Sequence, residues 1–149
     1  MALTADRNVK RKDGKLISYP VAANAVIYKG ALLMLDGGYI KPAQGQATGD
    51  AANAIFAGYA YEAVDNSGGA DGDKTVRVET EGTILVDGDG VAADVGKEVY
   101  VVDDATVSVS ASAVAGEENL KCGILVEVPS AGKNRIKIDN HVGQVAVTV

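Results

Sequence analysis

Apolar and polar side chains alternate at every second position over much of this chain. The clearest example is 75–80, TVRVET, and the same period returns at 106–110, 135–139 and 144–149. A period of two places one set of side chains on a buried face and the other set in water. These segments are therefore predicted to be half-buried strands of an antiparallel sheet.

Three other segments are mostly apolar and rich in β-branched residues, namely 83–86, 99–102 and 124–128. Continuous apolar runs of strand length are typical of strands that are covered on both faces. We therefore expect these three segments to form central strands of the fold.

Clusters of glycine, aspartate and asparagine separate the predicted strands, at 36–38, 66–69, 71–73 and 87–90. Glycine supplies positive φ angles, and aspartate and asparagine bond to nearby backbone groups, so each cluster predicts a tight turn. Many short strands joined by frequent turns predict an all-β fold, an antiparallel sandwich or barrel.

Helix is expected in very small amounts. The plausible helical turns are 92–95, which Gly96 would end, and 49–54. The stretches 42–54 and 110–119 are predicted to be surface loops.

The first fifteen residues differ from the rest of the chain in charge. They carry five of the fourteen basic side chains and two aspartates, a formal charge of +3, which leaves −9 on residues 16–149. The arm has too little apolar surface to offset the entropy of ordering it alone. We predict an extended N-terminal arm, 1–15, followed by a single all-β domain, 16–149. On charge alone the arm is a solvated tail, a segment folded back on the acidic body, or a strap for an acidic partner.

No set of residues predicts catalysis, a cofactor or a metal site. His141 is the only histidine, no GxSxG or GxxxxGK[ST] pattern occurs, and the aspartate-rich stretch 65–73 lacks EF-hand spacing. The aspartates are better explained by turns. Cys122, the only cysteine, lies in an apolar run and is predicted to pack as a small buried residue. The chain is predicted not to be an enzyme.

Charge and composition disfavour several partner classes. An acidic body and an isoelectric point near 4.7 do not suit nucleic acid. No apolar run has the roughly 18 to 20 residues that cross a membrane, and the chain becomes charged too early for a secretion signal. With no Trp and one Phe, there is little material for stacking sugars or bases.

Four blocks in a fixed order carry a resemblance. They are TADRN with the following basic residues and DG (4–14), PVAA…IYKGAL (20–32), AVDNSGGADGDKTVRV (63–78) and DVGKEVYVVDD (94–104). Together with CGILVEV at 122–128, they resemble the structural cement, or decoration, proteins of tailed bacteriophage capsids over nearly the whole chain.

The resemblance implies a small all-β, jelly-roll-like viral structural protein on the outer capsid surface of the virion, made in the cytoplasm of the bacterial host. Such a protein binds the exterior of the mature icosahedral head and bridges adjacent major capsid protein subunits. A homo-oligomer is implied, with a dimer on the capsid favoured. In this scheme the arm docks on acidic capsid patches. Its capsid-binding candidates are Arg7 and Arg11, which can bind carboxylates in a bidentate manner, and Lys10 and Lys12, which add steering.

Two questions stay open at this point. Residues 139–149 continue beyond the point where such proteins commonly stop, and this segment could add a strand to its own sheet or to a neighbour's. The alternative function is a secreted or virion-surface β-sandwich module that binds a glycan or protein receptor, against which the lack of a secretion signal and the few aromatics weigh.

Overall fold

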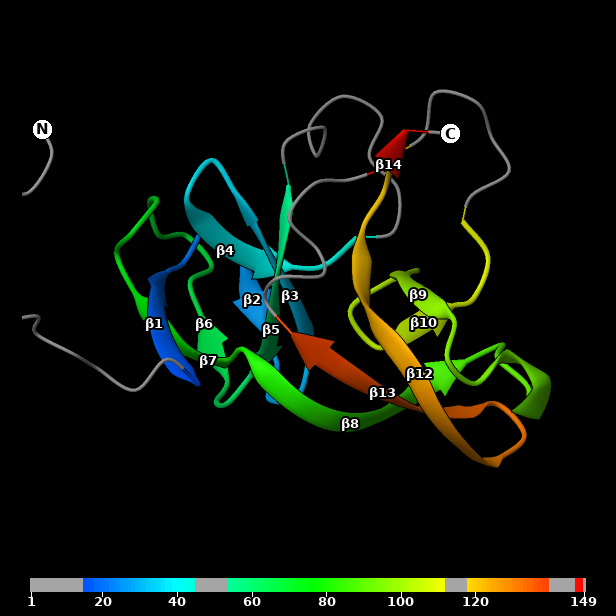
Figure 1. The fold of residues 1–149 in the computed structure, drawn as a ribbon. Coiled ribbons are helices and arrows are strands. Elements are labelled where there is room, and N and C mark those ends of the chain that lie inside the picture. The colour runs from blue at the N-terminus through cyan, green and yellow to red at the C-terminus, as the bar shows by residue number, and fades with distance from the viewer. Residues whose placement is uncertain (1–14, 45–53, 112–117, 140–146, 149) are drawn as a thin grey trace, which may run out of the picture.

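The computed structural model describes residues 15–44, 54–111, 118–139 and 147–148 (Figure 1). In chain order its elements are β1 (Leu16–Pro20), β2 (Val26–Ile27), β3 (Leu32–Asp36), β4 (Tyr39–Pro42), β5 (Ile55–Ala60), β6 (Val64–Asp65), β7 (Thr75–Glu79), β8 (Glu81–Gly88), the 3-10 turn η1 (Ala92–Asp94), β9 (Glu98–Val101), β10 (Thr106–Ser108), β11 (Glu118–Asn119), β12 (Lys121–Ser130), β13 (Lys133–Asp139) and β14 (Val147–Thr148).

Five strands form an antiparallel sheet in the order β1-β7-β5-β3-β4, on the left in Figure 1. Gly37 and Gly38 join β3 to β4 with φ angles of 59° and 89°, the backbone that two-residue hairpins prefer. A parallel bridge between Val21 and Ile40 brings the chain after β1 against β4, at the opposite edge. The sheet therefore curls around its own interior.

A second set of strands closes into a barrel in the order β10-β8-β13-β12-β9, on the right in Figure 1. Its pairs are antiparallel except for β8 with β10, which is parallel. The β8–β13 ladder is continuous from Asp87 opposite Lys133 to Glu81 opposite Asp139. The chain passes from the sheet to the barrel between β7 and β8, with only Thr80 between them.

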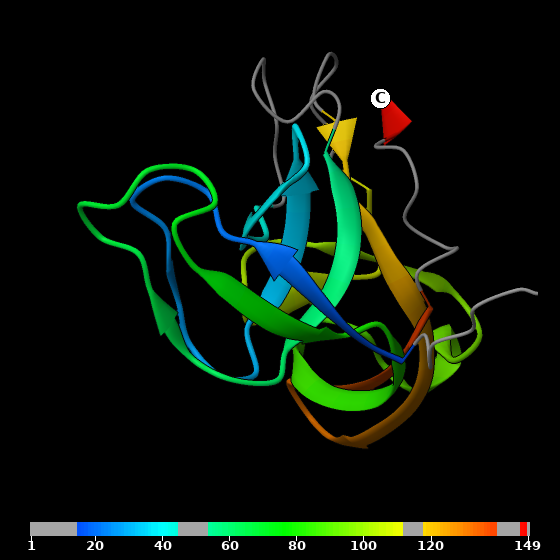
Figure 2. The ribbon, with the colours of Figure 1, turned by 90° about the vertical axis from the view of Figure 1, so that its left-hand side faces the viewer.

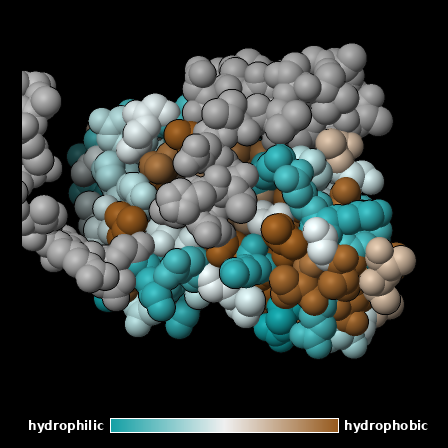
Figure 3. Space-filling model, viewed as in Figure 1, coloured by the Kyte–Doolittle hydropathy of each residue, from teal (hydrophilic) through white to brown (hydrophobic). Residues whose placement is uncertain are grey.

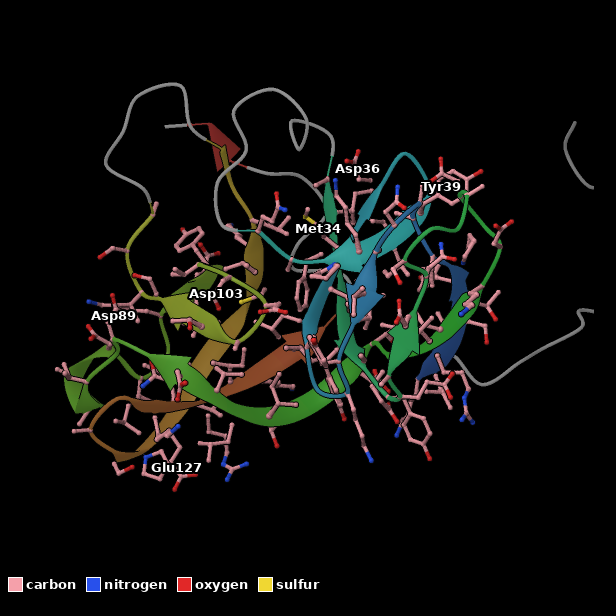
Figure 4. All side chains as sticks on the ribbon, turned by 180° about the vertical axis from the view of Figure 1, so that it is seen from behind. Met34, Asp36, Tyr39, Asp89, Asp103 and Glu127 are labelled. Carbon is pink, nitrogen blue, oxygen red and sulfur yellow. The ribbon has the colours of Figure 1, made fainter. Side chains whose placement is uncertain are left out.

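Two hydrophobic cores result. The sheet core contains Val21, Ile27, Ala31, Leu33, Ile40, Ala57, Ala60, Val76 and Val78. The barrel core contains Leu32, Met34, Ala43, Ala54, Phe56, Val86, Val99, Val101, Val107, Leu120, Cys122, Leu125, Ile136 and Ile138. Strand β3 contributes to both, because Leu33 packs in the sheet core while Leu32 and Met34, on its other face, pack in the barrel core. Figure 4 shows Met34 on this strand between the two sets of strands.

The predicted all-β class and the very low helix content are confirmed. The strand orders do not establish a jelly-roll arrangement, which stays a prediction, as does the division into an arm and a single domain. The helical turn predicted at 92–95 is confirmed as η1, and Gly96 follows it with a φ of 98°.

The alternating pattern predicts burial correctly, whereas the continuous apolar runs do not. Val76 and Val78 are buried and Arg77 is exposed between them, as expected for a half-buried strand. The predicted double coverage of 83–86, 99–102 and 124–128 is wrong, because Leu85 and Val102 are each 50% exposed and Ile124 is 39% exposed. In a closed barrel one face of each strand lines the interior and the other faces outward.

The two predicted loops begin or end in ordered structure. Ala43 and Ala54 are both 2% exposed in the barrel core, so the ends of the 42–54 stretch are not surface loop. The second stretch ends in β11, which pairs antiparallel with β14. Residues 147–148 thus add a strand to their own chain, which is one of the two outcomes left open by the sequence.

Candidate interaction surface

The four predicted capsid-binding residues, Arg7, Lys10, Arg11 and Lys12, lie outside the described residues. The end of the arm is described, however. The carbonyl oxygen of Lys15 accepts hydrogen bonds from the backbone N–H (2.8 Å) and the hydroxyl (3.1 Å) of Thr80, which is 2% exposed. Lys15 Nζ lies 3.8 Å from the Glu81 carboxylate. The point where the arm joins the body is therefore fixed at the junction of β7 and β8.

Immediately after this point, the chain enters β1, which lies beside β7 at the front of Figure 2. Val76 and Val78 point into the sheet core, so the alternate residues of β7, Arg77 and Glu79, point outward. The register places Arg77 opposite Ser18 of β1 and Glu79 opposite Leu16. We define the arm face as this outward row with the bend after β5: Leu16, Ser18, Tyr61, Glu62, Arg77 and Glu79.

At the centre of the arm face, three side chains form an ordered cluster. Arg77 donates from Nη2 to Glu62 Oε2 (2.8 Å) and from Nε to Glu62 Oε1 (3.2 Å), and its backbone N–H donates to the same Oε1 (3.1 Å). The guanidinium carbon lies 4.8 Å from the centroid of the Tyr61 ring. This is a bidentate ion pair stacked on an aromatic face, the geometry that suits arginine and not lysine.

These contacts shift the titration of both charged groups. Side-chain and backbone hydrogen bonds from Arg77 lower the pKa of Glu62, and the hydrogen bond to Glu62 raises the pKa of Arg77. Nearby on β5, burial raises the pKa of Tyr59, with a smaller effect from the Glu79 charge opposite it. Each member of the ion pair therefore favours the charged form of the other.

A glycine allows β5 to approach β7 at this place. Gly58 has a φ of 142°, and a Cβ atom there would lie 2.0 Å from the Glu79 carbonyl oxygen. Two residues later, the chain reaches Ala60, which pairs with Val78, and the Tyr61 N–H donates to the Arg77 carbonyl (3.0 Å). The close strand approach thus sets the position of the Tyr61 ring under Arg77.

In the aspartate-rich stretch 65–73, Asp65 and Asp73 bond within their own turns, as predicted, whereas Asp71 bonds a distant loop. Asp65 accepts the Ser67 N–H (2.9 Å), Asp73 accepts the Ala70 N–H (2.8 Å), and Asp71 accepts the Ala23 N–H (2.7 Å). The hydrogen bonds from Ser67 lower the pKa of Asp65. Within the described ranges, no three His, Cys, Asp or Glu side chains are grouped so that they could hold a metal ion.

An open cavity of about 450 Å³ lies beside the β3–β4 hairpin. It is lined by Ala22, Ala23, Asp36, Gly37, Tyr39, Lys41 and Asp71. Lys41 Nζ pairs with Asp36 at 2.6 Å, and Figure 4 shows Asp36 and Tyr39 at this hairpin. The polar groups of this lining are the Lys41–Asp36 pair, Tyr39 and Asp71.

The remaining candidates for chemistry are the single cysteine and the single histidine. Cys122 is 0% exposed in the barrel core, and its Sγ donates to the Val99 carbonyl (3.6 Å), so the prediction that it packs as a buried residue is confirmed. Burial raises the pKa of this thiol, which keeps it protonated and unreactive. His141 lies outside the described residues.

Sequence reasoning did not find the Tyr61–Glu62–Arg77 cluster. The alternation in 75–80 does place Arg77 on the outward face. Tyr61 and Glu62, however, follow a strand end, and their contact with β7 depends on the pairing of β5 with β7, which is distant in sequence. The only local sequence feature that points to this cluster is a Tyr-Glu pair directly after a strand that contains glycine.

No known protein family, curated protein or solved structure matches this chain. In the parts of the chain that the structure describes, no helix has the length and apolar character needed to cross a membrane.

Proposed function

We propose that this chain is a capsid cement protein of a tailed bacteriophage, which binds the exterior of the mature head and bridges adjacent major capsid protein subunits. The proposal starts from the four ordered sequence blocks and from the cationic arm. The observation that carries it in three dimensions is the continuity of the arm with the arm face, since the arm ends at the Thr80 anchor and β1 begins at the next residue.

The arm face has the composition of a protein contact surface. Tyrosine and arginine are enriched among the residues that contribute most to binding at interfaces. Tyr61 is 43% exposed, and its position is held by the Arg77–Glu62 pair, so little side-chain entropy is lost when a partner covers it. Leu16, 37% exposed, adds an apolar contact beside the arm.

In the proposed mechanism, the two parts act in different ways. The arm cations attract acidic patches on the capsid. The arm face then supplies a preformed contact that fixes the orientation of the body. A protein that binds the assembled shell and not free subunits stabilises the shell by mass action, and the gain is repeated at every site.

The test is co-sedimentation with expanded heads of the phage that encodes this chain, prepared without it, at moderate salt. Removing residues 1–12 is expected to abolish occupancy. The double variant Arg7→Ala/Arg11→Ala is expected to weaken binding roughly fivefold, from two charge pairs of about 0.5 kcal/mol each. The control Lys29→Ala/Lys74→Ala removes the same charge from exposed positions outside the arm and is expected to bind normally. Unchanged occupancy after the deletion contradicts the role of the arm.

A second part of the experiment tests the alternative that this chain is a receptor-binding module. The purified chain is incubated in parallel with heads and with whole bacterial cells. Binding to heads alone supports a cement protein. Binding to cells without binding to heads contradicts the proposal and favours a receptor-binding module.

A further inference from the structure

The open cavity beside the β3–β4 hairpin has a polar lining. Its volume of about 450 Å³ is within the range of small-ligand sites. In Figure 3, strongly apolar side chains gather over the barrel, whereas the visible surface over the sheet is mostly hydrophilic or intermediate. Apart from Ala22, Ala23 and Gly37, every lining residue has a polar or charged side chain. The cavity therefore suits a polar group.

The lining leaves one negative charge without a counterion. Lys41 Nζ donates to Asp36 Oδ2 at 2.6 Å, so these two charges neutralise each other. Asp71 is different. Its Oδ1 accepts the Ala23 N–H (2.7 Å), while among the described residues its Oδ2 has no hydrogen-bond partner and no cation pairs with it. The cavity thus presents one carboxylate oxygen that is free to accept.

The neighbouring charges do not change this balance. Asp73 accepts the Ala70 N–H (2.8 Å), and Lys74 Nζ donates to the Asp65 carbonyl. These two side chains have opposite charges, follow each other in the chain and lie outside the lining. The free charge of the cavity is therefore that of Asp71, and it favours a cationic group in the ligand.

The cluster on the arm face shows which cation fits such a lining. There, a backbone N–H holds one carboxylate oxygen, and the Arg77 guanidinium pairs with both oxygens and stacks on a tyrosine ring. In the cavity, a backbone N–H likewise holds one oxygen of Asp71. The Tyr39 ring is adjacent, since a Cβ atom at Gly72 would lie 3.6 Å from Tyr39 Cε1. The cavity repeats the tyrosine and the carboxylate of the cluster without its arginine.

We propose that this cavity binds the guanidinium group of an arginine side chain. The guanidinium donates to the free oxygen of Asp71 and lies against the Tyr39 ring, as Arg77 does in the cluster. A lysine ammonium supplies the same charge but has neither the planar stack nor the paired donors, so arginine is preferred.

The arginine comes either from a partner protein or from the arm of this chain. At the rise of a strand, Lys15 and Ala22 are about 23 Å apart along β1. An arm that turns back along β1 has about 26 Å of backbone between Lys15 and Arg7, but only about 13 Å between Lys15 and Arg11. Within the arm, Arg7 is therefore the arginine with the length to reach the cavity.

The test uses the purified chain and small probes, so it does not depend on the proposed function. N-acetyl-arginine amide is titrated into isotope-labelled protein, and the backbone NMR resonances of Ala22, Ala23 and Gly37 are followed. These resonances are expected to shift and saturate, with a dissociation constant on the order of millimolar. N-acetyl-citrulline amide, the uncharged isostere, is expected to bind about tenfold more weakly, because it offers no charged donor.

Substitutions test the carboxylate and the ring separately. Asp71→Asn keeps an acceptor for the Ala23 N–H but removes the charge, and it is expected to weaken probe binding about tenfold. Asp103→Asn is the matched control, because Asp103 is also exposed and its Oδ1 also accepts a backbone N–H, that of Ala105 (2.8 Å), but between β9 and β10. It is expected to bind like the wild type. Tyr39→Leu is expected to weaken binding about two- to fivefold, and Tyr39→Phe to retain it.

Arg7→Ala separates the two sources of the arginine. If Arg7 occupies the cavity, the three resonances shift in this variant without any probe, and the probe binds more tightly than to the wild type. If the arginine comes from a partner, both the resonances and the probe affinity stay unchanged. Either result supports a guanidinium site.

Four outcomes overturn the proposal. The first is the lack of a saturable shift in both the wild type and Arg7→Ala. The second is equal binding of the arginine and citrulline probes. The third is equal loss of affinity in Asp71→Asn and Asp103→Asn, which would indicate a general effect of charge. The fourth is tighter binding of acetate than of the arginine probe, which would assign the cavity to anions at Lys41.

Discussion

Strands β3 and β12 carry apolar runs of the same kind, yet they are buried in different ways. In β3, three consecutive residues, Leu32, Leu33 and Met34, are 0% exposed. In β12, Leu125 is 0% exposed, but Ile124 and Val126 on either side are 39% and 37% exposed. The difference arises because β3 lies between two cores, whereas β12 has a core on one face only. Apolar sequence alone therefore does not show whether a second layer covers a strand.

The strongest test of this comparison uses one glycine from the sheet and one from the barrel. Gly58 and Gly82 have φ angles of 142° and 130°, which alanine adopts only with strain. A Cβ at Gly58 would meet the Glu79 carbonyl at 2.0 Å, whereas a Cβ at Gly82 would meet nothing within 4 Å. Gly58→Ala is expected to cost about 2 to 6 kcal/mol, from strain and overpacking together, and Gly82→Ala about 1 to 3 kcal/mol, from strain alone. Urea unfolding measures both, and equal costs would contradict the close strand approach.

Two leucines test the burial difference directly. Leu33→Ala removes a side chain that is 0% exposed in the sheet core and is expected to cost about 2 to 5 kcal/mol. Leu85→Ala changes the same residue type at 50% exposure on the outside of the barrel, where a cost within about 1 kcal/mol is expected. Denaturant midpoints with unchanged slopes give both values. A large cost for Leu85→Ala at low protein concentration would mean that the outer face of the barrel is covered within one chain.

Two buried asparagines extend the comparison to polar groups. Asn134 in the barrel accepts the Gly90 N–H (2.9 Å) and donates to the Gly90 carbonyl (3.0 Å). Asn66 beside the sheet donates to the carbonyls of Ala22 and Ala70, while its Oδ1 has no partner among the described residues. Asn134→Ala leaves a donor and an acceptor of Gly90 unpaired and is expected to cost about 2 to 4 kcal/mol, against about 1 to 2 for Asn66→Ala. Thermal unfolding of both variants measures which substitution costs more stability. A larger cost for Asn66→Ala would contradict the greater importance of the two Asn134 hydrogen bonds.

The sequence predicts the parts of this fold that depend on local pattern. The alternation of 75–80 gives the buried and exposed faces of β7 correctly, and Asp36 with Gly37 and Gly38 gives the β3–β4 hairpin. The double coverage of β3 could not be predicted in this way. It arises from the packing of β3 and β5 on the barrel strands, and these contacts are distant in sequence.

The candidate surfaces were predictable to a smaller extent. The charge of the arm is visible in the sequence. The hydrogen bonds from Thr80 to Lys15, which fix the end of the arm, join positions 65 residues apart and have no local sequence pattern. The burial of Leu85 and Ile124 was wrongly predicted, because these exposed residues have the same sequence signature as buried strand residues. Exposure of an apolar side chain depends on what lies above it, which a local pattern does not contain.

The smallest predicted effect compares an ion pair of the sheet with one of the barrel. Hydrogen bonds from Arg77 lower the pKa of Glu62, and a hydrogen bond from Lys121 lowers that of Glu98. Arg77→Gln is expected to raise the pKa of Glu62 towards the ordinary value of about 4.3 and to leave that of Glu98 unchanged, and Lys121→Gln should do the reverse. NMR titration of the carboxyl carbons measures each group.

The sign of the effect on stability follows from these directions. A carboxyl whose pKa is lowered by folding stabilises the protein above its ordinary pKa, and this contribution is lost as the pH falls through the lowered value. Each variant should therefore lose stability relative to the wild type at neutral pH and approach it at the acid end. Both pairs are exposed, so the differences are small. A shift of Glu98 in Arg77→Gln would show that the sheet and the barrel are coupled, and it would contradict the independence of the two pairs.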